Sequence, residues 1–534
     1  MAERSGCFFT RLITCSILLA SYGVNSRADQ TGTEQSRLSL VHAVQVTLQV
    51  NPIIRAQEQQ LEQAAGIYEA TGGQFNTNTQ ASFGYGISNQ PFAVGDFYNR
   101  TLPPIDTLSA QNIDYKLGLD KLFRTGIKVA PSIQTIRFSP VGNNQEAFNN
   151  SSIVNLAITI PLMRGLGKEA TAAKEISASY GYEKARNELW QKISVEVTKT
   201  VTAYWDYVAA TQNLTVFEMA RERNLTLLTQ GKRLVEGDVI PRSDLNNYSA
   251  SLATSEADFA RSQQQQIAVR NNLGMVMGIS AENFVNIPVP SDDFPMIVEK
   301  DLHRLEASKA KVTEYALSHR NDVLAAEQNI LLYQALTVGA ENALKPLVNV
   351  DLDMGYQGLS QSNSAQGMFM PYGENVTGFT GGARINYEFP PSNDKAKGDY
   401  KQTNALLSEA HIMKDNLMRS VVSDLQVAEN ALNQNLLSLN YSLIAMDSRN
   451  EAFEAEKKKQ ISGLSTVINV TVVAQNLIQS ELAKIEAAQA LANSLVTFRY
   501  TTATLYVPGD DSQNVNLINL TSIPQQFQTD SKVK

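Results

Sequence analysis

Two long stretches of the chain carry apolar residues at helical spacing. Residues 168–234 and 395–459 contain no proline. At about 1.5 Å of rise per residue, each predicts a helix roughly 100 Å long. The apolar positions are Leu189, Ile193, Val197, Val201, Trp205 and Val208 in the first stretch, and Leu417, Val421, Leu425, Ala428, Leu432, Leu436, Leu439 and Leu443 in the second. Such stripes are typical of coiled-coil cores, and we expect them to bury helix on helix and to bind no cofactor.

Four shorter segments also predict helices, at 53–75, 242–279, 322–345 and 466–506. In each half of the chain, two short helices added end to end are nearly as long as one long helix. This match in length indicates that the short helices stack end to end beside the long ones. We therefore expect a helical wall of constant height rather than a compact bundle.

Four segments of about ten residues alternate with a period of two and predict strands, at 79–88, 152–161, 346–358 and 380–389. One face of each strand is apolar, and the other is polar or charged. This pattern is typical of transmembrane β-strands, although a soluble sandwich with one solvated face has the same period. The attached long helices favour the membrane interpretation. The side chains that we expect to face lipid are Phe83, Tyr85, Leu156, Ile158, Leu352, Met354, Ile385 and Tyr387.

Residues 112–123 and 126–138 predict an extra hairpin, which turns near Arg124-Thr125-Gly126. Its alternation is weaker, and Pro131 is expected to demote the second strand, because proline cannot donate to a ladder. The sequence leaves open whether this hairpin enters the sheet. Neither four nor six strands can close a barrel, and an open edge in lipid costs several kcal/mol per unpaired group. We therefore expect the chain to oligomerise.

The two halves of the chain are related by an internal duplication. Residues 48–58 resemble residues 317–327, Pro161 corresponds to Pro390, and Gly237 corresponds to Gly463. The first half carries about 40 additional residues between the first two of these landmarks, where the extra hairpin lies. The predicted organisation is a first repeat at 29–290, a connector at 291–310, a second repeat at 311–510 and a polar tail at 511–534.

The N-terminus has the layout of a secretory signal. Arg4 and Arg11 precede the apolar run 12–20, and small residues precede a cleavage site after Ala28, so residues 1–28 are predicted to be a signal peptide. The only cysteines, Cys7 and Cys15, lie in this segment. The mature chain is therefore expected to hold no disulfide and no cysteine-ligated metal, and Thr14 before Cys15 argues against a lipoprotein.

Composition narrows the functional classes. The chain is 43% hydrophobic and 18% charged, with 45 basic and 53 acidic residues and a net charge of −8. These values exclude a disordered chain and a basic nucleic-acid binder. The four histidines lie far apart, and no hydrolase or phosphate-binding motif occurs. We expect no cofactor, no metal and no enzymatic activity, and we interpret Asp292-Asp293 as a solvated pair in the connector.

In its order of elements the sequence resembles the TolC-type outer-membrane efflux and secretion channels, across nearly the whole mature length. The motifs that carry the resemblance are Ala316–Glu327, Ile160–Gly165, Leu234–Gly237 and Ile461–Leu464. The resemblance implies a mainly α chain with a membrane β-barrel portion, in which three copies of four strands give twelve. It also implies a long periplasmic α-barrel and an equatorial domain formed by residues 29–50, 284–315 and the C-terminal tail.

The implied function is that of a passive conduit in a tripartite efflux or type I secretion system. The resemblance implies a homotrimer in the outer membrane with a periplasmic extension. Its partners would be a periplasmic adaptor, an inner-membrane transporter and outer-membrane lipid, but no nucleic acid. The alternative, an exported non-porous coiled-coil structural protein of the envelope, requires the long helices but leaves the amphipathic strands unexplained.

The resemblance also assigns roles to the turns between helices. The adaptor-docking tips would be Leu234, Val235, Glu236, Gly237, Ser462, Gly463 and Leu464. The family places an aspartate six residues after the second turn glycine, and in some members another three residues later. Here these positions hold Asn469 and Val472, so the implied entrance constriction is uncharged. Asp238 and Asp244 are further candidates in the first half, and Asp244 also suits a helix N-cap after Pro241.

Overall fold

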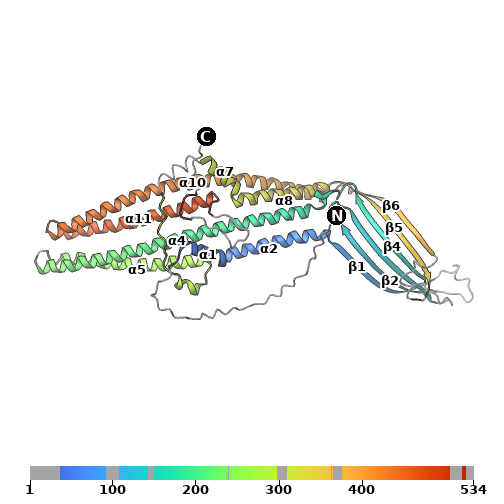
Figure 1. Ribbon diagram of the computed structural model, residues 1–534, viewed down its shortest axis with the longest axis horizontal. Coiled ribbons are helices and arrows are strands. Elements are labelled where there is room, and N and C mark those ends of the chain that lie inside the picture. The colour runs from blue at the N-terminus through green and yellow to red at the C-terminus, as the bar shows by residue number, and fades with distance from the viewer. Residues whose placement is uncertain are drawn as a thin grey trace, which may run out of the picture.

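The computed structural model forms one elongated molecule, with helices running away from a six-stranded sheet at one end (Figure 1). It describes residues 37–91, 107–141, 149–238, 240–297, 309–362, 364, 376–505 and 520–524. The predicted signal peptide at 1–28 lies outside these residues. The strands are β1 (Thr77–Pro91), β2 (Thr107–Leu122), β3 (Lys128–Val141), β4 (Asn149–Pro161), β5 (Leu347–Gln361) and β6 (Val376–Glu388).

The helices follow the predicted duplication. The first half contains α1 (Leu40–Val50), α2 (Pro52–Gly72), η1 (Gly73–Phe75), α3 (Lys168–Thr171), α4 (Ala173–Glu236), α5 (Asp244–Met277) and η3 (Ala281–Asn286). The second contains α7 (Lys309–His319), α8 (Asn321–Ala343), α10 (Asp394–Ile461) and α11 (Val467–Thr501). The long helices α4 and α10 have 64 and 68 residues, so each spans roughly 100 Å, as predicted.

Two boundaries of the predicted helices are wrong. The first long helix is interrupted at Ala172, where the backbone leaves helical geometry, so α3 forms a separate turn. The last predicted helix ends at Thr501 rather than 506. Thr502 caps it, and Ala503 adopts a positive φ of 54°. Both breaks come from local backbone conformations at positions without proline or glycine, so the sequence pattern offered no signal for them.

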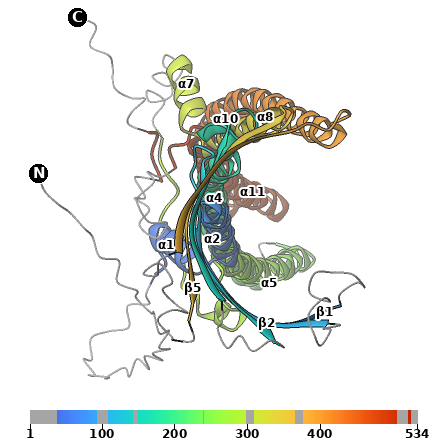
Figure 2. The same ribbon diagram turned by 90° about the vertical axis from the view of Figure 1, so that its right-hand side faces the viewer.

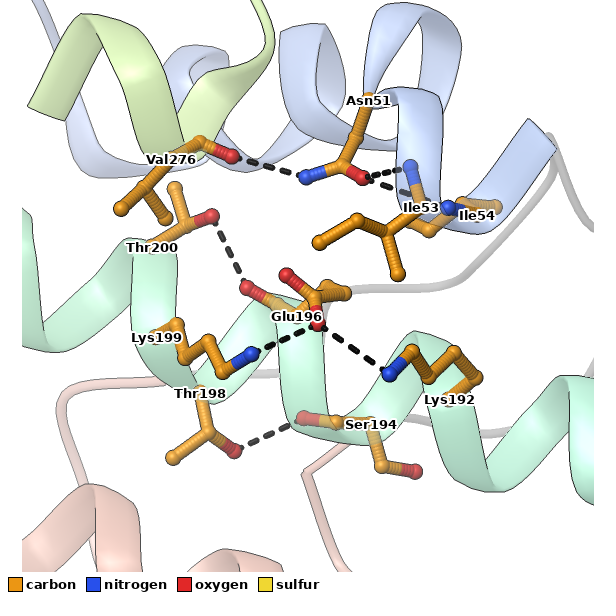
Figure 3. Close-up of polar contacts among 10 residues, drawn as sticks. All are labelled: Asn51, Ile53, Ile54, Lys192, Ser194, Glu196, Thr198, Lys199, Thr200 and Val276. Atoms are coloured by element: carbon orange, nitrogen blue, oxygen red, sulfur yellow. Dashed lines mark hydrogen bonds and ion pairs between the residues drawn. The ribbon is translucent and has the colours of Figure 1, made fainter. Parts of the chain in front are cut away.

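Short helices stack end to end along α4, as their lengths predicted. Asn51 caps α2, because its Oδ1 accepts from the backbone N–H of Ile53 and Ile54 at 2.8 and 3.2 Å. Its Nδ2 donates to the carbonyl of Val276, in the last turn of α5, at 2.8 Å (Figure 3). Gly278 ends α5 with φ of 82°, and a Cβ there would lie 2.7 Å from the Cα of Asn51. The two helix ends therefore abut directly.

The corresponding joint in the second half lies at Arg320, which is 269 positions after Asn51 and is the N-cap of α8. Its guanidinium lies 5.5 Å from the ring centroid of Tyr500, in the last turn of α11. Asp322 accepts two hydrogen bonds from it, at 3.0 and 2.6 Å. In each repeat, the N-cap of one short helix therefore lies at the joint with the other: Asn51 where α2 meets α5, and Arg320 where α8 meets α11.

The predicted apolar stripes form the core. All six stripe residues of α4 are buried, and Leu189 through Val208 belong to one cluster with α1 and the end of α5. Leu425, Leu432 and Leu436 of α10 pack with Leu491 and Leu495 of α11. These contacts are helix on helix, as the periodicity indicated.

The sheet is wholly antiparallel, and its order β1-β2-β3-β4-β5-β6 follows the chain. The extra hairpin therefore occupies the middle of the sheet, between β1 and β4. The expected demotion of its second strand is wrong, because β3 pairs on both sides. Its ladder with β4 runs unbroken through Pro131, whereas the ladder with β2 skips from Ser132 to Val129. The gap in pairing is on the side of β2. Because proline has no backbone N–H, Pro131 leaves no unpaired donor at this gap.

Seen from the sheet end, the strands and the helices below them follow one curve (Figure 2). Next to the sheet the helices pack in the order α2, α4, α8, α10, and farther away in the order α5, α4, α11, α10. The helices α1 and α7 lie on the convex side of the curve. The chain is thus a wall, bordered on one side by α2, α5 and β1 and on the other by α10 and β6.

Candidate functional site

One face of the sheet carries apolar residues on all six strands, and its polar members include Thr135 and Arg137 of β3 and Asn150 and Ser152 of β4. The register places Phe83 opposite Tyr115, Leu156 opposite Met354 and Val350 opposite Ile385, and directly opposed residues share a face. All eight residues that the sequence assigned to lipid lie on this face. The side chains of Phe83 and Ile385 are 74% and 71% exposed, so the wall leaves much of this band uncovered on its own. The other apolar members include Ala81, Ile113, Leu117, Leu119, Ile133, Val154, Ile158, Leu352, Tyr356, Phe379 and Tyr387.

The opposite face of the sheet is polar and internally hydrogen-bonded. Asp351 accepts from the hydroxyl of Thr159 at 2.7 Å and from the side-chain amide of Asn386. Lys128 and Asp120 form an ion pair at 3.2 Å. Asp114, Lys116, Gln134, Asn155, Asp353, Arg384 and Glu388 lie on the same face. A sheet with one apolar and one ionic face separates two environments of opposite polarity.

Glycines in β1 make room for this polar layer. A Cβ at Gly84 would lie 2.2 Å from Oδ1 of Asp114, and one at Gly86 would lie 2.6 Å from Oδ1 of Asn112. The alternation of glycine with aromatic residues in β1 therefore has a packing reason. It leaves space on one face for the side chains of β2, while Phe83 and Tyr85 stand on the other face.

The turn between β2 and β3 is fixed to the helices. Nε of Arg124 donates to Oε2 of Glu175 at 2.7 Å, and a second guanidinium nitrogen pairs with Oε1. The guanidinium also lies 4.8 Å from the ring centroid of Phe75, in η1. The hydrogen bonds from Arg124, with a smaller contribution from its positive charge, lower the pKa of the Glu175 carboxyl, although burial opposes this shift. The sequence offered no sign of this contact.

The adaptor-docking residues implied by the resemblance lie at the far ends of the helices (Figure 1). Leu234, Val235 and Glu236 are the last residues of α4, and Gly237 is its C-cap. Ser462 is the C-cap of α10, Gly463 has a φ of 72°, and Leu464 is 79% exposed. Both turns are therefore at the end of the molecule opposite the sheet, and both present apolar side chains.

The two helical hairpins pack together behind these turns. Leu227 and Tyr248 of the first hairpin share a cluster with Phe453, Val467 and Val470 of the second. In addition, Gln460 donates a side-chain hydrogen bond to the hydroxyl of Tyr248. The tips are thus held as one unit within the chain.

The candidate constriction residues lie just beyond the turns. Asn469 is exposed in the first turn of α11, and its backbone N–H donates to Oγ1 of Thr466 at 3.3 Å. Val472 is exposed one turn later. Asp238 is exposed and adopts a positive φ of 51°. The N-cap interpretation of Asp244 is wrong, because the backbone places Ser243 at the cap and Asp244 at the first helical position.

The interpretation of Asp292 as solvated is also wrong. Its Oδ2 accepts from the hydroxyl of Tyr204 at 2.7 Å and from the backbone N–H of Leu40 at 2.6 Å. Burial raises the pKa of the Tyr204 hydroxyl, and the hydrogen bond to Asp292 adds to that shift. Asp292 therefore fastens the connector to the start of α1 and the middle of α4. Only the fold could reveal this, because the partners are 88 and 252 residues away.

Buried polar groups also occur at the junction of α1 with α4. Glu196 is 2% exposed and pairs with Lys199 at 2.8 Å and Lys192 at 3.8 Å (Figure 3). The hydroxyls of Thr47 and Thr200 lie 3.0 Å apart. Throughout the described part of the chain, no three His, Cys, Asp or Glu side chains come together in a way that could hold a metal ion. Of the helices in the described ranges, none is both long enough and apolar enough to cross a membrane.

These features define an elongated wall with a two-faced sheet at one end and two helical turns at the other. No protein-family model and no curated protein sequence matches the chain. Solved structures of outer-membrane channels match its fold. The CmeC outer membrane channel of Campylobacter jejuni has a TM-score of 0.62 and 14% identity, with 89% of this chain and 87% of that chain covered.

Two further structures match in the same way. The outer membrane protein VceC of Vibrio cholerae has a TM-score of 0.60 and 13% identity, with 87% of this chain and 95% of that chain covered. The MtrE outer membrane channel of Neisseria gonorrhoeae, in its open state, has a TM-score of 0.57 and 14% identity, with 87% and 88% covered. The chain has the fold of these channels, which confirms the fold class implied by the sequence resemblance.

Proposed function

We propose that the chain is one protomer of a trimeric outer-membrane channel, a passive conduit that extends into the periplasm. The observation that carries the proposal is the apolar band of the sheet, which reaches all six strands and has exposed apolar side chains on each of them, opposite a polar and ionic face. Such a sheet suits lipid on one side and water on the other. The fold shared with solved outer-membrane channels supports the same assignment.

The borders of the wall support assembly with further copies. Large apolar side chains are exposed on the border helix α10 and on the opposite border helices α2 and α5. They include Ile412, Met413, Val427, Tyr441 and Ile444 on α10, Ile67 and Tyr68 on α2, and Ile267 and Met275 on α5. Copies arranged in a ring would cover these residues, because α10 of one copy then meets α2 and α5 of the next. The trimer would enclose a lumen on the concave side.

The helical turns are the part of the channel that meets its partners. The exposed Leu464 and the adjoining Ser462 and Gly463, with the end of α4, would dock a periplasmic adaptor that couples the channel to an inner-membrane transporter. The cargo then passes through the lumen in a tripartite efflux or type I secretion system. Asn469 and Val472, together with Asp238 and Asp244, would line the entrance.

Adjacent residues of β6 give a matched test. Ile385 belongs to the apolar face and Asn386 to the polar face. In Ile385→Arg the charge meets lipid and should cost about 2–4 kcal/mol if it lies near the midplane, so little folded channel should reach the membrane. Asn386→Arg should assemble and alter ion conductance. The measurements are native mass of detergent-extracted protein, expected at three copies, and current across planar bilayers. Equal effects of both substitutions, or a stable monomer without current, would contradict the proposal.

A further inference from the structure

The sheet is wider than the four strands per chain that the resemblance implied. The hairpin of β2 and β3 lies between β1 and β4, with long antiparallel registers on each side. Lys128 of β3, for example, stands opposite Thr159 of β4, and Tyr115 of β2 stands opposite Phe83 of β1. The apolar face continues through both added strands, at Leu117 and Ile133. The hairpin is therefore part of the two-faced sheet and no appendage to it.

The hairpin is also built into the junction with the helices. Its turn is closed by hydrogen bonds between Phe123 and Ile127 and between Gly126 and Phe123, both at 2.8 Å. The backbone N–H of Gly167, just before α3, donates to the carbonyl of Thr125 at 3.1 Å. A Cβ on Gly126 would lie 2.0 Å from the carbonyl oxygen of Gly165, so the two turns are in direct contact. The anchoring residues are those that lead from β4 into the long helix.

Only β1 and β6 have an open edge in the described sheet. β1 begins beside α2 and runs away from the helices, whereas β6 runs back toward them and ends before α10. The two edge strands are therefore antiparallel to one another in a ring of copies. Both present aromatic and branched residues on the same apolar face, at Phe83 and Tyr85 in β1 and at Ile385 and Tyr387 in β6. A second copy of this chain satisfies both edges without exposing the polar face to lipid.

We infer that β6 of one copy pairs with β1 of the next, so that a ring of three closes as an eighteen-stranded barrel instead of a twelve-stranded one. This inference rests on the proposed function, which supplies the ring of three and the membrane. In lipid each unpaired backbone group costs several kcal/mol, so neither edge can stay open. An even number of strands per copy keeps every pair antiparallel around the ring.

The dimensions of the wall agree with six strands. With strands ~4.8 Å apart and tilted by ~40°, each strand takes up ~6.3 Å of circumference. Six strands then cover ~38 Å, and four cover only ~25 Å. The four helices next to the sheet, at ~9–10 Å per helix, cover ~36–40 Å. The sheet with the extra hairpin therefore continues the helical layer at the same width.

The barrel that results is wide. The same values give a diameter between strand axes of ~36 Å for eighteen strands, against ~24 Å for twelve. The membrane part of the conduit is then as wide as the helical part beneath it. The membrane part then limits the size of cargo no more than the helical part beneath it does.

Cysteine pairs distinguish the two barrels in the intact protein, since the native cysteines both lie in the predicted signal peptide. In four separate variants, cysteine replaces Phe83 of β1 together with one residue of β6, which is Phe379, Gly381, Ala383 or Ile385. A second pair joins Tyr85 of β1 to Ile113 of β2, which stand opposite one another. A third joins Tyr85 to Val154 of β4, the strand that would lie beside β1 in a twelve-stranded barrel without the hairpin. Single-cysteine variants serve as controls for assembly.

We expect at least one β1–β6 pair to link chains into covalent dimers and trimers under a short bifunctional maleimide. The β1–β2 pair should link within one chain, and the β1–β4 pair should not react. Reaction of the β1–β4 pair, or no β1–β6 product at any of the four positions, would overturn the inference. If the largest β1–β6 cross-linked product held a number of chains other than three, that result would contradict the proposed trimer and not the strand pairing. End-on electron microscopy of the extracted ring gives an independent strand count, and twelve would also overturn it.

Discussion

Arg124 and Glu175, 51 residues apart in the chain, hold the extra hairpin of the sheet to the start of the longest helix of the first repeat. The contact is bidentate, and the carboxylate side chain is only 12% exposed. Gly72, at the end of α2, lies beside it, since a Cβ there would be 3.3 Å from Oε1 of Glu175. One ion pair thus connects the sheet with two helices of the wall.

The first prediction is acid sensitivity of this junction. The hydrogen bonds from Arg124 lower the folded-state pKa of Glu175 below its ordinary value. The pair therefore stabilises the fold above the ordinary carboxyl pKa, and this contribution disappears as pH falls through the lowered pKa. Glu175→Gln should remove that step from the pH dependence of thermal unfolding. Glu183→Gln, on an exposed pair of the same helix with Arg186, is the matched control and should leave it in place.

The second prediction concerns ion selectivity. On the polar face of the sheet, the carboxylates of Asp114, Asp120, Asp351, Asp353 and Glu388 outnumber the cations of Lys116, Lys128 and Arg384. Three copies should therefore favour cations in the lumen, because clefts of one sign concentrate counter-ions.

A reversal potential measured across a salt gradient tests this preference. Asp353→Lys should shift the potential toward anions, and Leu352→Gln, one residue away on the apolar face, should not. Anion preference in the parent channel would contradict the prediction, and raised salt should weaken the effect in every variant.

The third prediction concerns the entrance. At the proposed entrance Asn469 would offer only neutral oxygen, whereas three carboxylates near a narrow axis hold a hard cation. Asn469→Asp should therefore create block by divalent or trivalent cations added on the periplasmic side, seen as a loss of single-channel current. Asn476→Asp, about two turns farther along α11, is the matched control and should create no such block. Strong block of the parent would place the charge elsewhere, with Asp238 and Asp244 the first residues to replace.

The fourth prediction concerns the joint between α2 and α5 (Figure 3). Asn51 is 2% exposed, caps α2 and donates to the carbonyl of Val276. Asn51→Ala removes a cap worth about 1 kcal/mol and leaves a carbonyl without a partner at about 1–3 kcal/mol. The free energy of unfolding in denaturant should fall by about 2–4 kcal/mol. Asn51→Asp keeps the cap and should lose less, and equal losses in both variants would show that the cap contributes nothing.

Local periodicity accounts for most of what could be predicted. Leu425 and Leu432 recur at helical spacing, so their burial follows from a short window of sequence. The faces of β5 and β6 likewise follow from the alternation around Leu352 and Ile385. These signals are strong because the elements are long and each has one apolar side, and an apolar side must be covered by protein or lipid.

The amino-acid sequence by itself determined the long helices, the strand faces, the duplication and the positions of the turns. Only the tertiary structure decided that the hairpin around Arg124 enters the middle of the sheet, that Pro131 is tolerated there, and that Asp292 binds Tyr204. The physical reason is the same in each case. Each outcome depends on residues far away in the chain, which no local pattern specifies. These residues decide which strands are neighbours, which side of a strand a proline leaves without a donor, and which group a carboxylate binds.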